Sequence, residues 1–452
     1  MRYFACVRRR VLDLVIGLTA TALILVVPAT AQSSETIQPP NPLPTEVKPP
    51  LSLDFTQLLH WARVRNPEWA AALAGPKAAE GDLLQAGMTP NPVLSLHSTV
   101  ELPSRLQSGG LSISQELELG GKRSARIAAA QARLEATRQR ASETERQLRL
   151  GLRQAYTELL YAQSLLALRE EALDLAEQTL RLTRGRLKAG DVAGVDVLQL
   201  EVEVARRRSE LEQARGEVAA SRIALTRLFG GQGTDFVLAG ELGALKVIPD
   251  LGELLRVAST RPDLLAAQAD ASAGDKEVRV QETRGISNLT ASLGLARERL
   301  FIGGDSISPP GLINQIDERN WAASLSISIP LPINDTNEGN IKRAQAQAEG
   351  YKLTRLATEQ KVLTEVSQFY AQWNAARGSL EPLEQTALSK ARQALSITDQ
   401  AYHLGYRSLL NVLQSRQEYL ALRQAQLDAQ RNLELSLARL EAAVGKPIGG
   451  AP

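Results

Sequence analysis

Apolar and small polar residues alternate strictly along four short segments of the chain, at about 93–102, 111–119, 288–297 and 321–330. A period of two predicts strands that each have one apolar and one small polar face. This pattern is typical of a half-buried sheet in a soluble protein and equally of a membrane barrel. The segments have roughly the 9 to 11 residues that a tilted membrane strand needs, and few other apolar segments could cover them. The sequence therefore favours lipid against the apolar face.

A leucine recurs every seven residues after the second strand, which predicts a coiled-coil helix. The repeat consists of Leu152, Leu159, Leu166, Leu173, Leu180 and Leu187. No proline occurs between Lys122 and Leu187, so one helix is expected over 122–187, roughly 100 Å long at about 1.5 Å per residue. Further helices are expected at 196–229, 338–403 and 409–444. No compact globular domain requires a helix of that length, so it must span a distance or form the wall of an assembly.

The chain carries an internal duplication. The stretch "LSISQELEL" from Leu111 is echoed by "LSISIPLPI" from Leu325, and "RLFG", ending at Gly230, is echoed by "EAAVG", ending at Gly445. Each half is expected to hold a short helix, two strands, a very long helix, a tight turn and a second long helix. The repeats are placed at 51–230 and 251–445, with a linker at 231–250 and a tail at 446–452.

The first 31 residues differ from the rest of the chain. Three arginines precede an apolar run from Val11 to Val27, and Ala29 and Ala31 follow it. This is the pattern of a secretory signal, and cleavage after Ala31 is expected. The alternative is an uncleaved membrane anchor, which Asp13 within the run disfavours. Residues 32–50 hold six prolines and predict an extended lead-in.

Composition excludes several classes of function. With 44% hydrophobic and 23% charged residues and a formal net charge of +2, the chain gives no reason to expect a nucleic-acid partner. Its one cysteine, Cys6, would leave with the signal, and its three histidines are far apart. No motif for nucleophilic, phosphate-binding or zinc-dependent chemistry is present. We therefore expect no catalytic residue, no resident metal site and no cofactor.

Four strands cannot close a barrel alone. Two edge strands would expose unpaired backbone groups to hydrocarbon, where each costs several kcal/mol. Several protomers must therefore share one barrel. A dimer would give a tightly filled barrel of about eight strands and a trimer an open barrel of about twelve, and only the larger leaves an aqueous lumen.

The chain resembles the TolC-like outer-membrane efflux channels of Gram-negative bacteria over nearly all of its mature length, from about Leu53 to Gly445. The junctions "SISQELELGGKRSARIAAAQA" and "SISIPLPINDTNEGNIKRAQAQ" look most like those of the heavy-metal branch, the cobalt–zinc–cadmium resistance proteins. The second departs from that pattern at Ile333 and Asn334, where an aromatic-containing pair is expected. The resemblance implies a mainly α fold with a small β part. It also implies a homotrimer in which a shared 12-stranded barrel continues into a periplasmic helical tunnel.

The resemblance further implies that a periplasmic adaptor, bound to a proton-driven inner-membrane pump of the RND type, docks at the turns 188–195 and 404–408. The matching positions are Gly190, Asp191, Val192, Ala193, Gly194, Asp196, Leu404, Gly405, Tyr406, Arg407 and Ser408. Glycines suit such turns, and Asp196 is a plausible cap for the returning helix. We hypothesise that Arg407 and Tyr406 latch onto Asp191 or Asp196, because opposite charges occupy equivalent turns. The alternative is that these are solvated turn residues.

Three acids could line the lumen by the alternation of their strands, namely Glu101, Glu116 and Glu118. Scattered acids in a water-filled passage favour cations weakly, without the tight binding that would slow their exit.

The sequence thus predicts a passive outer-membrane conduit for heavy-metal cations, with the energy for transport supplied by a partner. One alternative has the same architecture and serves drug efflux or type I protein secretion. Another, of a different class, is a periplasmic coiled-coil adaptor or scaffold.

Overall fold

The computed structural model describes residues 52–101, 106–230, 236–240, 242–243, 247–302 and 316–448. All of them belong to the unit Pro49–Pro452, which is separate from the unit Met1–Lys48. The expected signal at 1–31 and lead-in at 32–50 lie outside the described residues, as do 231–235, 241 and 244–246 of the linker.

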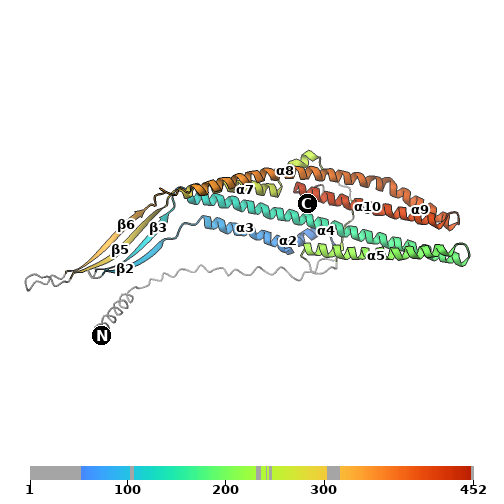
Figure 1. Cartoon of the computed structure of the whole chain (residues 1–452), viewed down its shortest axis with the longest axis horizontal. Coiled ribbons are helices and arrows are strands. Elements are labelled where there is room, and N and C mark those ends of the chain that lie inside the picture. The colour runs from blue at the N-terminus through green and yellow to red at the C-terminus, as the bar shows by residue number, and fades with distance from the viewer. Residues whose placement is uncertain are drawn as a thin grey trace, which may run out of the picture. The chain divides into compact units, whose positions relative to one another are not determined.

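Each half of the chain places two helices before a strand pair and two long helices after it (Figure 1). The first half contains α2 (Phe55–Arg65), α3 (Pro67–Ala86), β2 (Val93–Glu101), β3 (Leu106–Leu117), α4 (Lys122–Lys188) and α5 (Gly194–Leu228). The second contains α6 (Leu251–Ala258), α7 (Pro262–Arg284), β5 (Leu289–Ile302), β6 (Ile316–Ser328), α8 (Glu338–Pro382), the π-helix η1 (Leu383–Ala387), α9 (Leu388–His403) and α10 (Leu409–Val444). The short strands β1 (Ser52–Leu53) and β4 (Val237–Leu238) pair in parallel.

Prolines explain why two helices, and not the single short helix expected, precede each strand pair. Pro67 and Pro262 start α3 and α7. A residue before proline avoids the helical region, and Asn66 (ψ 120°) and Arg261 (ψ 136°) are both extended. Each of them also holds the end of a returning helix. The Asn66 side chain donates to the carbonyl of Leu228 at 2.8 Å, and Arg261 donates to that of Ala443 at 3.1 Å.

The four longer strands form one antiparallel sheet in the order β2-β3-β5-β6. Its register brings residues of one type into rows across the sheet. One row is Leu94, Ile113, Leu293 and Leu325, and the neighbouring row on the opposite face is Ser95, Ser112, Gly294 and Ser324. β5 and β6, at 14 and 13 residues, are longer than the alternating segments suggested. Strands from both halves thus share one sheet whose faces differ sharply.

The strand-to-helix junctions need unusual backbone. Gly120 (φ 69°) and Gly121 (φ 74°) adopt left-handed conformations immediately before α4, which glycine tolerates without strain. Asn337 (φ 64°) has the same conformation immediately before α8. These residues turn the chain from the sheet into the long helices.

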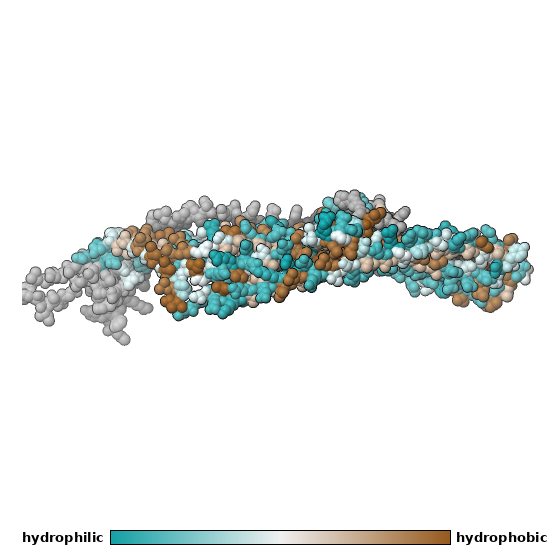
Figure 2. Space-filling model, turned by 90° about the horizontal axis from the view of Figure 1, so that it is seen from above, coloured by the Kyte–Doolittle hydropathy of each residue, from teal (hydrophilic) through white to brown (hydrophobic). Residues whose placement is uncertain are grey.

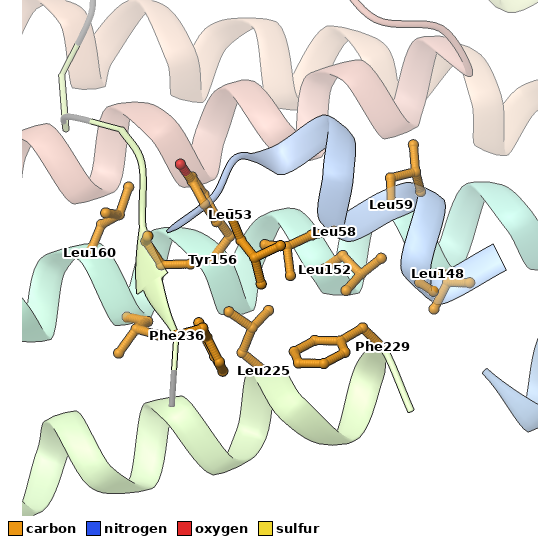
Figure 3. Packing of buried hydrophobic residues seen from close by; sticks show 13 residues of the cluster. Leu53, Leu58, Leu59, Leu148, Leu152, Tyr156, Leu160, Leu225, Phe229 and Phe236 are labelled. Carbon is orange, nitrogen blue, oxygen red and sulfur yellow. The ribbon is translucent and has the colours of Figure 1, made fainter. Parts of the chain in front are cut away.

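One helical core joins the middle of α4 to the end of α5 and to α2 (Figure 3). Leu152 of α4 and Leu225 of α5 are fully buried there, and Phe229 is 1% exposed. The rings of Phe229 and Phe236 meet edge to face at 5.7 Å. A corresponding cluster joins α6, α8 and α10 in the second half. Within the described parts of the chain, no helix is long and apolar enough to cross a membrane.

Candidate functional site

The apolar face of the sheet is uncovered in the single chain. Its leucines are exposed at 80% (Leu96), 61% (Leu293) and 71% (Leu325). Figure 2 shows hydrophobic residues gathered at the end of the molecule that carries the sheet. A contiguous apolar surface on a sheet has to meet an apolar environment or a partner.

The opposite face carries small and polar side chains. Besides the row through Ser112, it contains Ser114, Ser292 and Ser326 side by side on β3, β5 and β6. At Gly294 an added Cβ would lie 2.6 Å from Oγ of Ser324, so a larger residue at this position would have to displace that side chain. This face thus carries mainly glycine and serine residues along these two rows.

The three candidate acids have different environments. Glu101 ends β2, and its side chain lies outside the described residues. Glu116, on the polar face, is exposed, and its Oε1 accepts a hydrogen bond from the side-chain amide of Asn288 at 2.5 Å. Glu118 lies beyond β3 with only 12% of its side chain exposed, and it forms an ion pair with Arg126. The Arg126 hydrogen bond, opposed by burial, holds the pKa of Glu118 below its ordinary value. Arg126 offsets the charge of Glu118, which leaves Glu116 as the stronger candidate.

The two interhelical turns have the same backbone structure and lie at the opposite end of α4 from the sheet (Figure 1). Gly190 (φ 82°) lies two residues after the end of α4, and Gly405 (φ 80°) lies two residues after the end of α9. In each turn the amide of the next residue donates to a carbonyl five positions earlier, from Asp191 to Arg186 at 2.9 Å and from Tyr406 to Ala401 at 2.8 Å. This is the Schellman pattern of a helix that ends at a left-handed glycine.

Most of the residues expected to contact an adaptor are exposed. Leu404 and Tyr406 are exposed at 72% and 81%, whereas Val192 and Asp196 are half-buried. The expected capping by Asp196 is wrong, because α5 begins at Gly194 and its N-cap is Ala193, without a side-chain cap. Asp196 lies instead in the first turn, where its charge complements the helix dipole.

The hypothesised latch of Arg407 and Tyr406 onto Asp191 or Asp196 stays a prediction. Among the described ion pairs, none joins Arg407 to Asp191 or Asp196. The two hairpins are connected further from the turns. The hydroxyls of Thr183 and Tyr402 lie 3.0 Å apart, and Arg186 donates to the Tyr402 carbonyl at 3.3 Å.

Arg416 makes a second connection between the hairpins. Its guanidinium donates to the Leu175 carbonyl at 2.8 Å, to the hydroxyl of Thr179, and to Asp399 at 2.7 Å. Sequence reasoning missed these contacts because their residues lie inside helices. One signal was available, since Tyr402 follows Leu388 and Leu395 at a spacing of seven residues and brings a hydroxyl into that apolar seam.

Within the described residues, no cluster of His, Cys, Asp or Glu could hold a metal ion. His60 lies in α2 and His97 in β2, while the side chain of His403 lies outside the described part of the structure.

Comparison with known proteins agrees with this geometry. The family model described as outer membrane efflux protein matches residues 58–231 and 255–446. The chain is 29% identical to the cobalt-zinc-cadmium resistance protein CzcC of Cupriavidus metallidurans, covering 86% of this chain and 88% of that protein. It is 27% identical to the pyoverdine export outer membrane protein OpmQ of Pseudomonas aeruginosa, covering 76% and 70% of the two chains.

Solved structures share the fold. CusC superposes with a TM-score of 0.71 at 20% identity, over 87% of this chain and 92% of that one. VceC from Vibrio cholerae superposes with a TM-score of 0.68 at 22% identity, over 87% and 96%. The expected mainly α fold with a small sheet is thereby confirmed. The chain belongs to the outer membrane efflux protein family, whose members are outer-membrane channels with a periplasmic helical part and not enzymes.

Proposed function

We propose that this channel exports heavy-metal cations as the outermost part of a tripartite, proton-driven efflux system. The observation that carries the proposal is the likeness to a cobalt-zinc-cadmium resistance protein over 86% of the chain. Membership of a channel family also argues against the adaptor or scaffold alternative.

Growth of a deletion strain tests the transported solute. The strain is grown with zinc, cobalt, cadmium, nickel, copper or silver, and with antibiotics and detergents as controls. Selective metal sensitivity that the wild-type chain reverses is the expected result. Sensitivity to drugs alone would instead favour the drug-efflux alternative. The likeness to OpmQ supports a further candidate, export of an organic chelator, which sensitivity to iron limitation without metal sensitivity would favour.

We infer a homotrimer from the sheet. β2 and β6 are its edge strands, and their unpaired backbone groups cannot face lipid. Three copies that join β2 of one to β6 of the next give a barrel of about twelve strands with its polar face inside. The rows that end at Leu96 and at Leu325 would then form an apolar belt in contact with outer-membrane lipid.

Cysteine cross-linking tests this closure. Cys6 is the only cysteine of the chain and lies in the expected signal, so no native cysteine would compete with an introduced pair for disulfide formation. Cysteines placed in turn along β2 and β6 should yield a covalent trimer in at least one register. Covalent dimers without trimers in every register would contradict the trimer.

The turns are the proposed docking site of a periplasmic adaptor. The docking proposal is supported by the exposed apolar surface at Leu404 and Tyr406. Val195 and Leu198 continue this surface on α5, where they are 55% and 62% exposed. A photo-cross-linking residue at Tyr406 should capture the adaptor. The matched control is Ile223, a 63% exposed residue near the far end of α5. Equal capture at both positions would count against docking at the turns.

The polar contacts between the hairpins are the proposed closing contacts. Arg416→Gln removes the ion pair with Asp399 and should raise the resting single-channel conductance. Arg439→Gln, an exposed position on the same helix, is the control. Arg407→Ala tests the latch in the assembled channel, where the partner of Arg407 could be Asp191 of a neighbouring copy. An unchanged resting conductance in this variant would exclude the latch.

A further inference from the structure

A cavity of about 210 Å³ lies where the two halves of the chain meet on α4. Its walls come from the start of α2, from α4, from the first residue of α7, and from the end of α10 with the residues that follow it. These segments are far apart in the sequence, and the packing of α2, α7 and α10 against α4 brings them together. The cavity is distinct from the sheet faces and from the turns.

Four basic side chains line this cavity, against two acidic ones. Two of the cations are already neutralised. Arg146 binds Glu143 at 2.6 Å and donates to the carbonyl of Ala442 at 2.6 Å. Arg153 binds Glu434 at 3.1 Å.

The other two cations, Arg149 and Lys446, have no hydrogen-bond or ion-pair partner among the described residues. Glu145 precedes Arg149 by four residues, the spacing at which helical ion pairs form. Its carboxylate instead binds Arg63 of α2. Arg149 therefore stays half-buried with its donors unused, although a planar guanidinium is suited to hold a carboxylate through two bonds.

The acidic and apolar lining restricts the ligand further. The carboxylate of Glu441 accepts the backbone N–H of Ile448 at 3.2 Å and would repel an anion on its own side of the cavity. Phe55, Leu150 and Pro262 supply an apolar wall, and the guanidinium of Arg153 lies 4.9 Å from the Phe55 ring centre. The cavity is smaller than the roughly 300–1,000 Å³ typical of sites for drug-sized ligands. It therefore suits one anionic group on a small apolar body.

We propose that this cavity binds a small organic acid. Arg149 and Lys446 would bind its carboxylate, and the wall that contains Phe55 would contact its apolar part. The proposal is independent of the solute that the channel carries, because none of these residues belongs to the proposed lumen or docking surface.

4-Bromobenzoate is a direct probe, because it has a carboxylate, a small ring and an anomalous scatterer. Crystals of the full chain soaked with it should show bromine in the cavity and the carboxylate at Arg149. The neutral 4-bromobenzamide, of nearly the same shape, should not occupy the site. Bromine that is found only elsewhere, or equal occupancy by the amide, would overturn the proposal.

Binding to variants in detergent solution supplies the second readout. Arg149→Gln should weaken 4-bromobenzoate binding by about tenfold or more, the usual consequence of losing a hydrogen bond to a charged group. It should leave the melting temperature unchanged, since Arg149 has no partner to lose. Lys446→Gln, at an exposed position, should weaken binding in the same direction, and Arg439→Gln on α10 should have no effect. An affinity unchanged in both the Arg149 and the Lys446 variant would overturn the proposal.

Discussion

Replacement of Leu293 by arginine tests which face of the sheet meets lipid. Leu293 lies in a central strand, in the row with Ile113 and Leu325, and is 61% exposed in the single chain. Covering that exposed part with lipid stabilises the barrel by about 1–2 kcal/mol, three fifths of the value for a fully buried leucine. An arginine on the lipid face costs a further 2–4 kcal/mol or so near the bilayer midplane. We therefore expect Leu293→Arg to destabilise the folded channel by about 3–6 kcal/mol.

Urea unfolding of the channel refolded into lipid vesicles measures this loss, and the amount of protein in the outer membrane provides a check in cells. Ser292→Arg is the matched control, because Ser292 is the adjacent residue of the same strand and lies on the polar face. On that face an arginine can reach water, so little destabilisation is expected. If Ser292→Arg destabilised the channel as much as Leu293→Arg, the assignment of the two faces would be refuted.

Three further predictions concern the helical part. Arg261 is 1% exposed and binds the half-buried carboxylates of Asp263 and Glu365, so Arg261→Met should cost about 1–3 kcal/mol at pH 7 through the loss of these charge-assisted hydrogen bonds. Burial alone would raise the pKa of Asp263, but the bonds and charge of Arg261 outweigh it and hold this pKa below its ordinary value. The stability that ionised Asp263 gains from Arg261 is therefore present at neutral pH and is lost as the pH falls below about 4 and through the lowered pKa. In that acidic range the denaturation midpoints of the wild type and of Arg261→Met should converge. Gly405→Ala, at φ 80°, should destabilise the second hairpin by about 1–2 kcal/mol in hydrogen exchange, whereas Gly216→Ala inside α5 should not destabilise. Phe229→Ala should lower stability by about 3–5 kcal/mol, and a loss below 1 kcal/mol would show that the core of Figure 3 is not a tightly packed one.

The sequence by itself determined the duplicated order of elements and the two-faced strands. Periods of two and of seven are local signals, because they reflect which residues of one segment share a face. Proline and glycine positions also act locally, so the bends at Gly121, Gly190 and Gly405 could be anticipated. The split into α2 and α3 was missed, although Pro67 carried the signal for it. The π-helix η1 follows Pro382 in what was expected to be one uninterrupted helix.

Only the tertiary structure decided which side chains of different segments meet. Alternation predicts Glu118 in the lumen but does not reveal its ion pair, and the fold brings Arg126 to its carboxylate. The contact between Thr183 and Tyr402 joins residues 219 positions apart, and no local pattern encodes it. The same holds for the unpaired Arg149, since Arg63 of another helix takes the carboxylate four residues before it. Periodicity fixes the face on which a side chain lies, whereas its partner depends on the packing of segments distant in the chain.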